Sequence, residues 1–103
     1  MTTTREYFEQ KVPELIANNP EKLKAINGVF QFNVAGAGEW VVDCKEGKVF
    51  EGKGEKVDTT LDITAEDFEA ILGKKLNPMM AFSTRKLKVT GNLPLSLKLQ
   101  TIL

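Results

Sequence analysis

Two stretches of alternating apolar residues, joined by a turn, restrict the fold of this chain more than any other feature of its sequence. Residues 29–34 (VFQFNV) and 39–45 (EWVVDCK) both follow the two-residue period of a β-strand, and GAG at 36–38 suits a hairpin turn. The apolar side chains that share a strand face are Phe30, Phe32, Val34, Trp40, Val42 and Cys44. The pattern predicts an antiparallel meander with one strongly aromatic face, turned toward the rest of the protein.

Further strands and helices are expected on both sides of this hairpin. Strands are predicted at 48–53, 59–64 and 85–91, which makes five. A capping box at residues 3–6 opens a helix that reaches Ile16, and Pro13 is expected to break or restart that helix. Other helices are predicted at 20–27, 65–73 and 78–84, the last as a short turn or helix. These elements indicate one α+β domain over residues 1–103.

The leucine-rich segment GNLPLSLKLQTIL at 91–103 fits two structures. In a strand every second residue would be a leucine, but Pro94 would lie where it cannot donate a ladder hydrogen bond. In a helix capped near Asn92, with Pro94 in the first turn, the segment has two apolar stripes. One stripe consists of Leu95, Leu99, Ile102 and Leu103, and the other of Leu93 and Leu97. We favour the helix.

A helix that is apolar on two sides requires two apolar neighbours. One neighbour is the sheet. The other is a partner protein or an apolar ligand, unless the segment simply completes the core.

Composition excludes several classes of function. The chain has 14 basic and 14 acidic residues, so its formal charge is zero, which argues against a dedicated nucleic-acid binder and against a polybasic membrane anchor. It has no histidine and one cysteine, which excludes histidine-based catalysis, disulfides and multi-cysteine metal sites. Cys44 alternates with Trp40 and Val42 and is expected to be a buried apolar residue. We therefore predict no catalytic, metal or cofactor residues.

The two ends of the sequence bear on its location. The polar start MTTTREYFEQ does not have the pattern of a signal peptide, and no stretch has the length of a membrane span. The end QTIL is not a peroxisomal tripeptide. These features predict a cytoplasmic protein.

Three segments together resemble the sterol carrier protein type 2 domain. They are WVVDCKEGK at 40–48, DITAEDFEAILGKKLNPMMAF at 62–82 and KLKVTGNLPLSLKLQ at 86–100. The resemblance extends from about residue 28 to residue 103. It implies a five-stranded, mostly antiparallel sheet covered on one face by helices, with an apolar tunnel between them and the C-terminal helix in its wall.

The resemblance also implies a function. Members of this family bind fatty acids, fatty acyl-CoA, sterols or phospholipids and move them between membranes without a cofactor. The partners expected for this chain are thus a lipid, transient contact with a membrane and no nucleic acid, with the protein a monomer or weak dimer. The alternative is a protein-interaction or dimerisation module that keeps the fold and has no role in lipid transport.

The residues expected to line the cavity come from the aromatic strand face, the helices at 65–84 and the tail. They are Phe30, Phe32, Trp40, Val42, Phe68, Leu72, Met79, Met80, Phe82, Leu95, Leu99, Gln100, Ile102 and Leu103. Flexible methionines suit a surface that accepts varied apolar shapes, but Met79 and Met80 also suit a core. Gln100 either binds a lipid head group or lies in solvent. The basic cluster at 85–88 either meets a phosphate or forms a solvated strand face.

Overall fold

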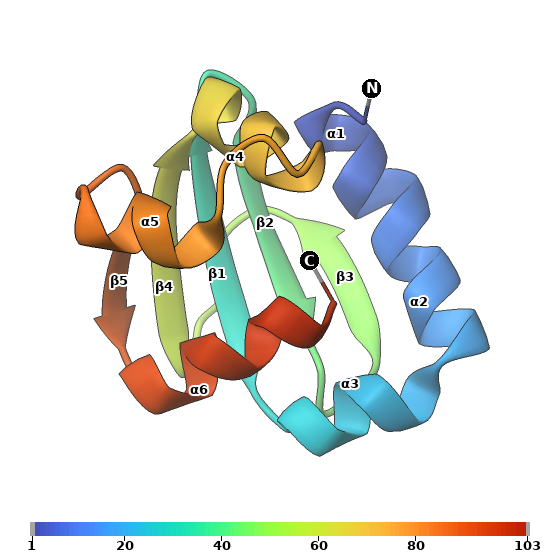
Figure 1. The fold of residues 1–103 in the computed structure, drawn as a ribbon. Helices are drawn as coiled ribbons and strands as arrows, with labels where there is room; N and C mark the ends of the chain where they lie inside the picture. Colours follow the sequence, from blue (N-terminus) through green and yellow to red (C-terminus); the bar gives the residue numbers. More distant parts are fainter. Residues whose placement is uncertain (1, 103) are drawn as a thin grey trace.

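A five-stranded sheet forms the centre of the molecule (Figure 1). The computed structural model describes residues 2–102. The strands are β1 Val29–Ala35, β2 Gly38–Asp43, β3 Lys48–Glu51, β4 Thr59–Thr64 and β5 Lys88–Gly91. Their order in the sheet is β3-β2-β1-β4-β5. Each of the five predicted strands is therefore confirmed, although β5 begins three residues later than its sequence pattern suggested.

The sheet is mixed, and mostly antiparallel as predicted. The pairs β1–β2, β2–β3 and β4–β5 are antiparallel, whereas β1 and β4 at the centre are parallel. The loop at residues 52–58 carries the chain from β3 back across the sheet to β4. The buried amide of Gln31 holds this crossover, because it donates to the carbonyl of Gly52 (3.0 Å) and accepts from the N–H of Gly54 (2.8 Å).

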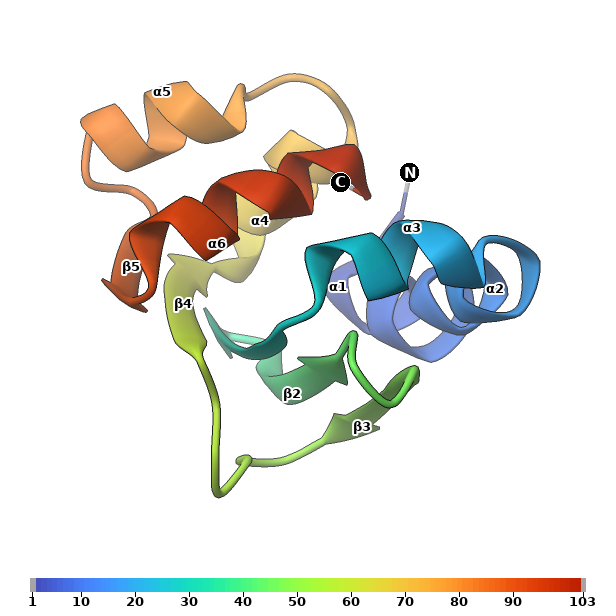
Figure 2. The same ribbon diagram turned by 90° about the horizontal axis from the view of Figure 1, so that it is seen from below.

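The helices cover one face of this sheet (Figure 2). They are α1 Thr4–Glu6, η1 Tyr7–Lys11, α2 Val12–Asn18, α3 Pro20–Ile26, α4 Ala65–Leu72, α5 Pro78–Ser83, α6 Leu93–Leu97 and η2 Lys98–Thr101. The two ends of the chain meet here, since the Tyr7 hydroxyl donates to the Ile102 carbonyl (3.4 Å). Among residues 2–102, no helix has the length and apolar character needed to cross a membrane.

Pro13 restarts the N-terminal helix rather than ending it, because the regular helix α2 begins at Val12 and has Pro13 in its first turn. The preceding turn at Tyr7–Lys11 is π-helical, and the N–H of Val12 donates to the carbonyl of Tyr7. Proline lacks an N–H and its ring crowds the preceding turn of a regular α-helix. A wider turn directly before Pro13 relieves that crowding, so the helix absorbs the proline without ending.

The aromatic strand face predicted from the sequence is the core of the protein. Phe30, Phe32, Trp40 and Val42 are all buried against the helices. Phe8 from η1 lies at the centre of this core, and its ring stacks on Trp40 (4.7 Å between centroids) and on Phe68 of α4 (5.5 Å). Helices and sheet are therefore joined by one aromatic cluster.

The leucine-rich tail is helical, as predicted. The Asn92 side chain accepts a hydrogen bond from the N–H of Leu95 (2.9 Å), and Pro94 lies in the first turn. Leu99 and Ile102 are buried, and Leu95 packs against the core. Leu93 and Leu97 of the second stripe remain 42% and 48% exposed. Leu103 lies outside the described residues.

Removing the cap of α6 should destabilise the protein measurably. We expect Asn92→Ala to lower the free energy of unfolding by about 1 kcal/mol, because the N–H of Leu95 loses its side-chain acceptor. Thermal denaturation followed by circular dichroism measures the change. Asn92→Asp is the matched control, since aspartate accepts the same hydrogen bond, and an equal loss in both variants would contradict this role.

Candidate lipid-binding site

An apolar pocket of about 180 Å³ lies where α5 and α6 meet β4 and β5. The residues that line it are Leu61, Pro78, Met79, Phe82, Leu87, Val89, Leu93, Ser96, Leu97, Leu99 and Gln100. Two of these side chains are polar. The Ser96 hydroxyl donates to the carbonyl of Leu93 (2.6 Å), which leaves Gln100 as the polar side chain available to a ligand.

The outer wall of this pocket is α5, a six-residue helix that buries little of its own surface. Asn77 caps it by accepting from the N–H of Met79 (2.8 Å), and the N–H groups of Lys86 and Leu87 both donate to the carbonyl of Ala81. Ala81 is its one buried residue. Figure 2 shows α5 beside α6 at the margin of the molecule. The helix is thus held at its cap and at Ala81, and Met79 and Phe82 lie along the pocket.

A second hollow of about 250 Å³ adjoins the apolar pocket. Pro78 and Gln100 line both spaces. The other residues of the second hollow are Ile71, Lys74, Leu76 and Asn77. Its lining contains a lysine and two side-chain amides but no carboxylate, so it suits an anionic or hydrogen-bonding group.

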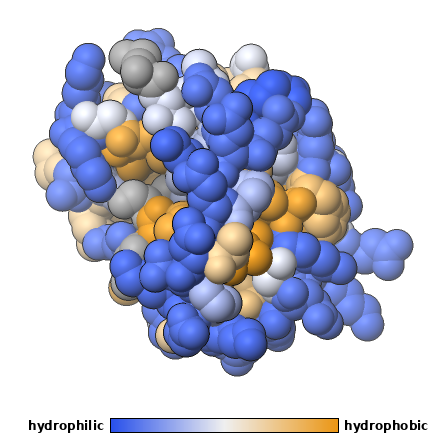
Figure 3. Space-filling model, turned by 90° about the vertical axis from the view of Figure 1, so that its right-hand side faces the viewer, coloured by the Kyte–Doolittle hydropathy of each residue, from blue (hydrophilic) through white to orange (hydrophobic). Residues whose placement is uncertain are grey.

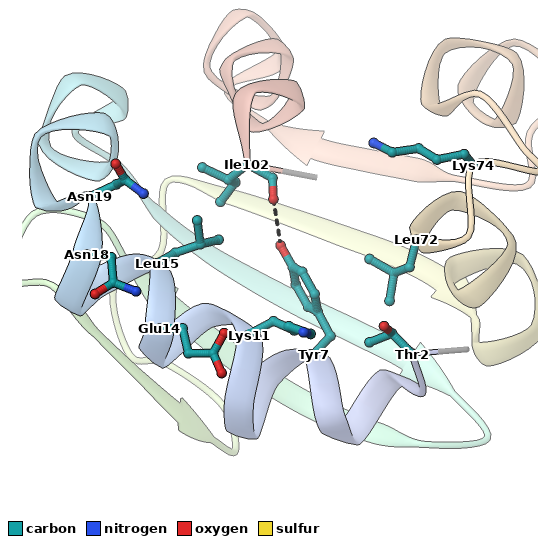
Figure 4. A pocket seen from close by; sticks show the side chains of 10 residues that line it. All are labelled: Thr2, Tyr7, Lys11, Glu14, Leu15, Asn18, Asn19, Leu72, Lys74 and Ile102. Atoms are coloured by element: carbon teal, nitrogen blue, oxygen red, sulfur yellow. Dashed lines mark hydrogen bonds between the residues drawn. The ribbon is translucent and has the colours of Figure 1, made fainter.

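Lys74 lines both the second hollow and a third one of about 350 Å³. The third hollow reaches the N-terminal helix (Figure 4). Its lining is formed by Thr2, Tyr7, Lys11, Glu14, Leu15, Asn18, Asn19, Leu72, Lys74 and Ile102. Burial raises the pKa of the Tyr7 hydroxyl far above its usual value, so this group remains a neutral hydrogen-bond donor. Three adjacent hollows therefore follow the C-terminal segment, and the first is the most apolar of them.

The structure brings some of the predicted cavity residues together and separates others. Four of them line the apolar pocket: Met79, Phe82, Leu99 and Gln100. Leu72 and Ile102 line the third hollow. The members placed in the core are Phe30, Phe32, Trp40, Val42 and Phe68.

Two further candidates lie elsewhere. Met80 is exposed outside the pocket. Leu95 packs so closely on Gly28 that a methyl group there would come within 2.5 Å of its side chain. The contact of each candidate with a lipid stays a prediction.

Seven residues of the apolar pocket were not predicted from the sequence: Leu61, Pro78, Leu87, Val89, Leu93, Ser96 and Leu97. The sequence did carry a signal for two of them. Leu93 and Leu97 form the second apolar stripe of the tail, and such a stripe requires an apolar neighbour of its own. In the structure this stripe faces the pocket, whereas the stripe expected to face the ligand is largely core.

Metal ligands and the single thiol were the other candidates for reactive groups in the described part of the chain. Within residues 2–102, no group of three or more histidine, cysteine or acidic side chains is placed to hold a metal ion. Cys44 lies in the core, 1% exposed, as expected. Burial, aided by the charge of Asp43, raises the pKa of its thiol to about 11. The thiol is therefore protonated near neutral pH.

Cys44 should resist alkylation in the folded protein. At pH 8 a thiol with this pKa is about one part in a thousand thiolate, and it has almost no contact with solvent. We expect iodoacetamide to leave the native protein unmodified by mass spectrometry and to modify it fully in guanidinium chloride. Rapid modification of the native protein would show that the core around Cys44 opens readily.

Comparison with known proteins agrees with the fold. A family model described as the SCP-2 sterol transfer family matches residues 9–103. Human sterol carrier protein 2 is 38% identical over 102 residues, which cover 92% of this chain and 19% of that protein. Hydroxysteroid dehydrogenase-like protein 2 of Danio rerio is 39% identical over 90 residues, covering 82% of this chain and 22% of that protein. The chain thus spans about a fifth of the length of these relatives.

Solved structures match over nearly the whole chain. The crystal structure of sterol carrier protein 2 like 2 from Aedes aegypti superimposes with a TM-score of 0.83 at 29% identity, covering 96% of this chain and 95% of that one. The solution structure of palmitated SCP2L2 from the same organism gives 0.80 at 30% identity, covering 98% and 94%. Fold and sequence similarity agree, and the chain belongs to the SCP-2 sterol transfer family.

Proposed function

We propose that residues 1–103 act as one carrier unit that holds the acyl chain of a fatty acid in the apolar pocket between α5 and α6. One observation supports this most strongly: an almost wholly apolar pocket ends at Gln100 and continues into a hollow that contains Lys74 and Asn77. An amphipathic molecule fits this order of surfaces. Its chain lies against leucine and methionine, and its carboxylate lies at the Gln100 end.

The pocket must widen to receive such a ligand. Its volume of about 180 Å³ is below the roughly 300–1,000 Å³ usual for small-molecule sites. Met79, Leu93 and Leu97 are half exposed, so their side chains can turn outward without opening the core. Ala81 is the one buried residue of α5, and Pro78 of this helix lines both spaces, so an outward shift of α5 would join the pocket to the adjoining hollow and make room for a chain.

Fatty acid is the ligand class that the similarities favour. SCP2L2 from Aedes aegypti, 30% identical to this chain, has a solution structure in its palmitated form. Each buried methylene contributes about 0.8 kcal/mol, and association costs remove several kcal/mol. We therefore expect a dissociation constant between about 10 nM and 10 μM. Fatty acyl-CoA, sterol and phospholipid are competitors to be compared in the same assay.

The proposed role is that of a carrier and includes no catalytic step and no cofactor. The dehydrogenase-like relatives are much longer, and this chain matches about a fifth of their length. The name of these relatives thus describes proteins several times longer than this chain. We place the carrier in the cytoplasm.

Titration with a fluorescent fatty acid, followed by displacement with unlabelled palmitate, tests the proposal. We expect saturable binding of one ligand per chain and competition by palmitate. Absence of saturable binding below about 100 μM would contradict the carrier function. Lipid extraction and mass spectrometry of the purified protein provide an independent check, since a lipid-free protein that dimerises reversibly would favour an interaction module.

A further inference from the structure

A hollow of about 660 Å³ lies at one end of the sheet, where the parallel strands β1 and β4 finish and α4 begins. We call it the polar hollow, and its charged and amide side chains are Asn33, Glu39, Asp62, Asp67, Arg85, Lys86 and Lys88. On β1 and β4, Asn33 and Asp62 alternate with buried residues of the core, so they project from the opposite face of the sheet. Among the described residues, none lines both the polar hollow and the apolar pocket or the two hollows beside it.

The acidic wall of the polar hollow presents three side chains with oxygen acceptors in a row across the sheet. Asn33 pairs with Glu39 of β2 on one side and with Asp62 of β4 on the other. Its Nδ2 donates to Oδ1 of Asp62 (3.1 Å), whereas its own Oδ1 is buried and has no hydrogen-bond partner within residues 2–102. An orphaned buried acceptor is rare in folded proteins and points to a donor from outside the chain. A primary ammonium, which has three N–H donors, matches these three acceptors.

The basic wall of the polar hollow faces these acceptors. Lys88 of β5 is the cross-strand neighbour of Asp62, and Arg85 and Lys86 lie in the turn between α5 and β5. All three cations are exposed, and in the part of the chain that the structure describes no ion pair joins them to a carboxylate. Cations and carboxylates therefore line one hollow without pairing, which leaves both walls available to a ligand.

The backbone of Arg85 supports a role for its side chain. Its φ of 65° lies in the left-handed region, which glycine usually occupies just after a helix. Arginine is less favourable than glycine in this conformation, and no ion pair among the described residues offsets that cost. A contact between the guanidinium and a ligand would account for an arginine at this position.

We propose that the polar hollow binds a small zwitterion with a primary ammonium and a phosphate, such as an aminoalkyl phosphate. The ammonium lies against Glu39, Asn33 and Asp62, and the phosphate lies against the three cations of the basic wall. Asn33 is partly exposed, so a small rotation of its side chain turns the orphaned oxygen toward the ammonium. A phosphate monoester suits three cations, since it has three acceptor oxygens and a charge of about −1.5 to −2 near neutral pH. The inference goes beyond the proposed carrier function, because it assigns a second site on the other face of the sheet.

Nuclear magnetic resonance of the ¹⁵N-labelled protein, titrated with phosphoethanolamine, tests the proposal. We expect saturable shifts of backbone amides at 33–39, 62–67 and 85–88, with a dissociation constant below about 1 mM. Inorganic phosphate and ethanolamine should each bind about tenfold more weakly or worse, because each meets only one wall. A weaker constant for phosphoethanolamine, equal binding of phosphate alone, or shifts confined to other residues would overturn the site.

Two variants separate the walls. Asp62→Asn keeps an acceptor for the Asn33 amide and removes one negative charge. We expect it to bind phosphoethanolamine about tenfold more weakly and inorganic phosphate at least as well as the unaltered protein. Arg85→Gln/Lys88→Gln should weaken both ligands about tenfold or more. Loss of phosphate binding in Asp62→Asn would show general damage to the hollow and refute the role of the acidic wall.

The matched control removes two exposed lysines from α3, Lys22 and Lys24. They belong to the N-terminal helices, on the side of the molecule whose surface is mostly hydrophilic (Figure 3). Lys22→Gln/Lys24→Gln has the same change in net charge as Arg85→Gln/Lys88→Gln, and we expect affinity for phosphoethanolamine to change about twofold or less. An equal loss in both double variants would show that net charge alone governs binding and would overturn the site.

Further titrations distinguish the other occupants of the polar hollow. Glycerophosphoethanolamine has the phosphodiester of a lipid head group, with one negative charge fewer, and should bind several-fold more weakly than phosphoethanolamine. Tighter binding would assign the hollow to a lipid head group and overturn the proposal. Shifts at the same amides on raising the protein concentration, without ligand binding, would assign it to a second copy of the chain and overturn the proposal as well.

Fatty-acid titration keeps this inference apart from the proposed function. Saturating phosphoethanolamine and the variant Asp62→Asn should both leave affinity for the fluorescent fatty acid unchanged, since the two sites share no lining residue. Competition between the two ligands would place them in one site and refute the separate hollow. Fatty-acid binding without phosphoethanolamine binding would overturn the polar hollow alone.

Discussion

Replacing Phe8 with alanine should lower the free energy of unfolding by about 3–5 kcal/mol, because this ring lies at the centre of the aromatic core. Phe8 is 1% exposed and its ring contacts those of Trp40, Phe68 and Phe32, the last at 5.1 Å between centroids. Truncation removes the ring contacts of Phe8 with the sheet and with α4, and it leaves a cavity between them. Urea denaturation monitored by Trp40 fluorescence measures the loss.

A loss of this size is a large part of the roughly 5–15 kcal/mol that stabilises a small domain, so a milder variant belongs in the experiment. Phe8→Leu should cost less, because leucine fills much of the same space. Phe50→Ala is the control for an exposed aromatic residue on β3, and it should change stability by about 1 kcal/mol or less. Similar losses for Phe8→Ala and Phe50→Ala would contradict the central position of Phe8.

The second large effect expected is a loss of ligand affinity in Leu97→Gln. Leu97 lines the apolar pocket and is 48% exposed, so the polar side chain is tolerated in the free protein. Bound lipid would cover the new amide without providing a hydrogen-bond partner. This lowers the free energy gained on binding by about 1–3 kcal/mol. We expect affinity for the fluorescent fatty acid to fall about tenfold while the melting temperature changes little.

The neighbouring Leu99 provides a contrast. It also lines the pocket but is 1% exposed and belongs to the core, so Leu99→Gln should lower both stability and affinity. Phe50→Gln, far from the pocket, serves as the control for an exposed apolar-to-polar change. If Leu97→Gln bound the fatty acid as tightly as Phe50→Gln, the pocket between α5 and α6 would not be the ligand site.

Local patterns in the sequence were sufficient for most of the fold. The two-residue period at 29–45 identified the central hairpin and its buried face, since strand geometry assigns alternate residues to opposite faces. Asn92 and Pro94 identified the tail as a helix, because a cap and a first-turn proline depend on neighbouring residues. The family resemblance was also present in the sequence alone.

Pairings between distant segments were not determined by these patterns. The parallel partnership of β1 and β4 depends on a crossover that Gln31 holds, and no local period encodes which strand lies beside which. The continuation of the helix through Pro13 likewise depends on a π-helical turn, which accompanies the packing of Phe8 in the core rather than following from local preference.

The division of apolar residues between core and site was decided by the tertiary structure. Composition and spacing show that Trp40, Leu97 and Leu99 are apolar and periodic, but all three fit a core and a lipid pocket equally well. Packing decides among them: the helices bury Trp40 completely, η2 places Leu99 between core and pocket, and the short helix α5 leaves Leu97 at an open rim. Burial is a property of the whole assembly of elements, so the sequence determined which residues are apolar, and the fold decided which of them remain available to a ligand.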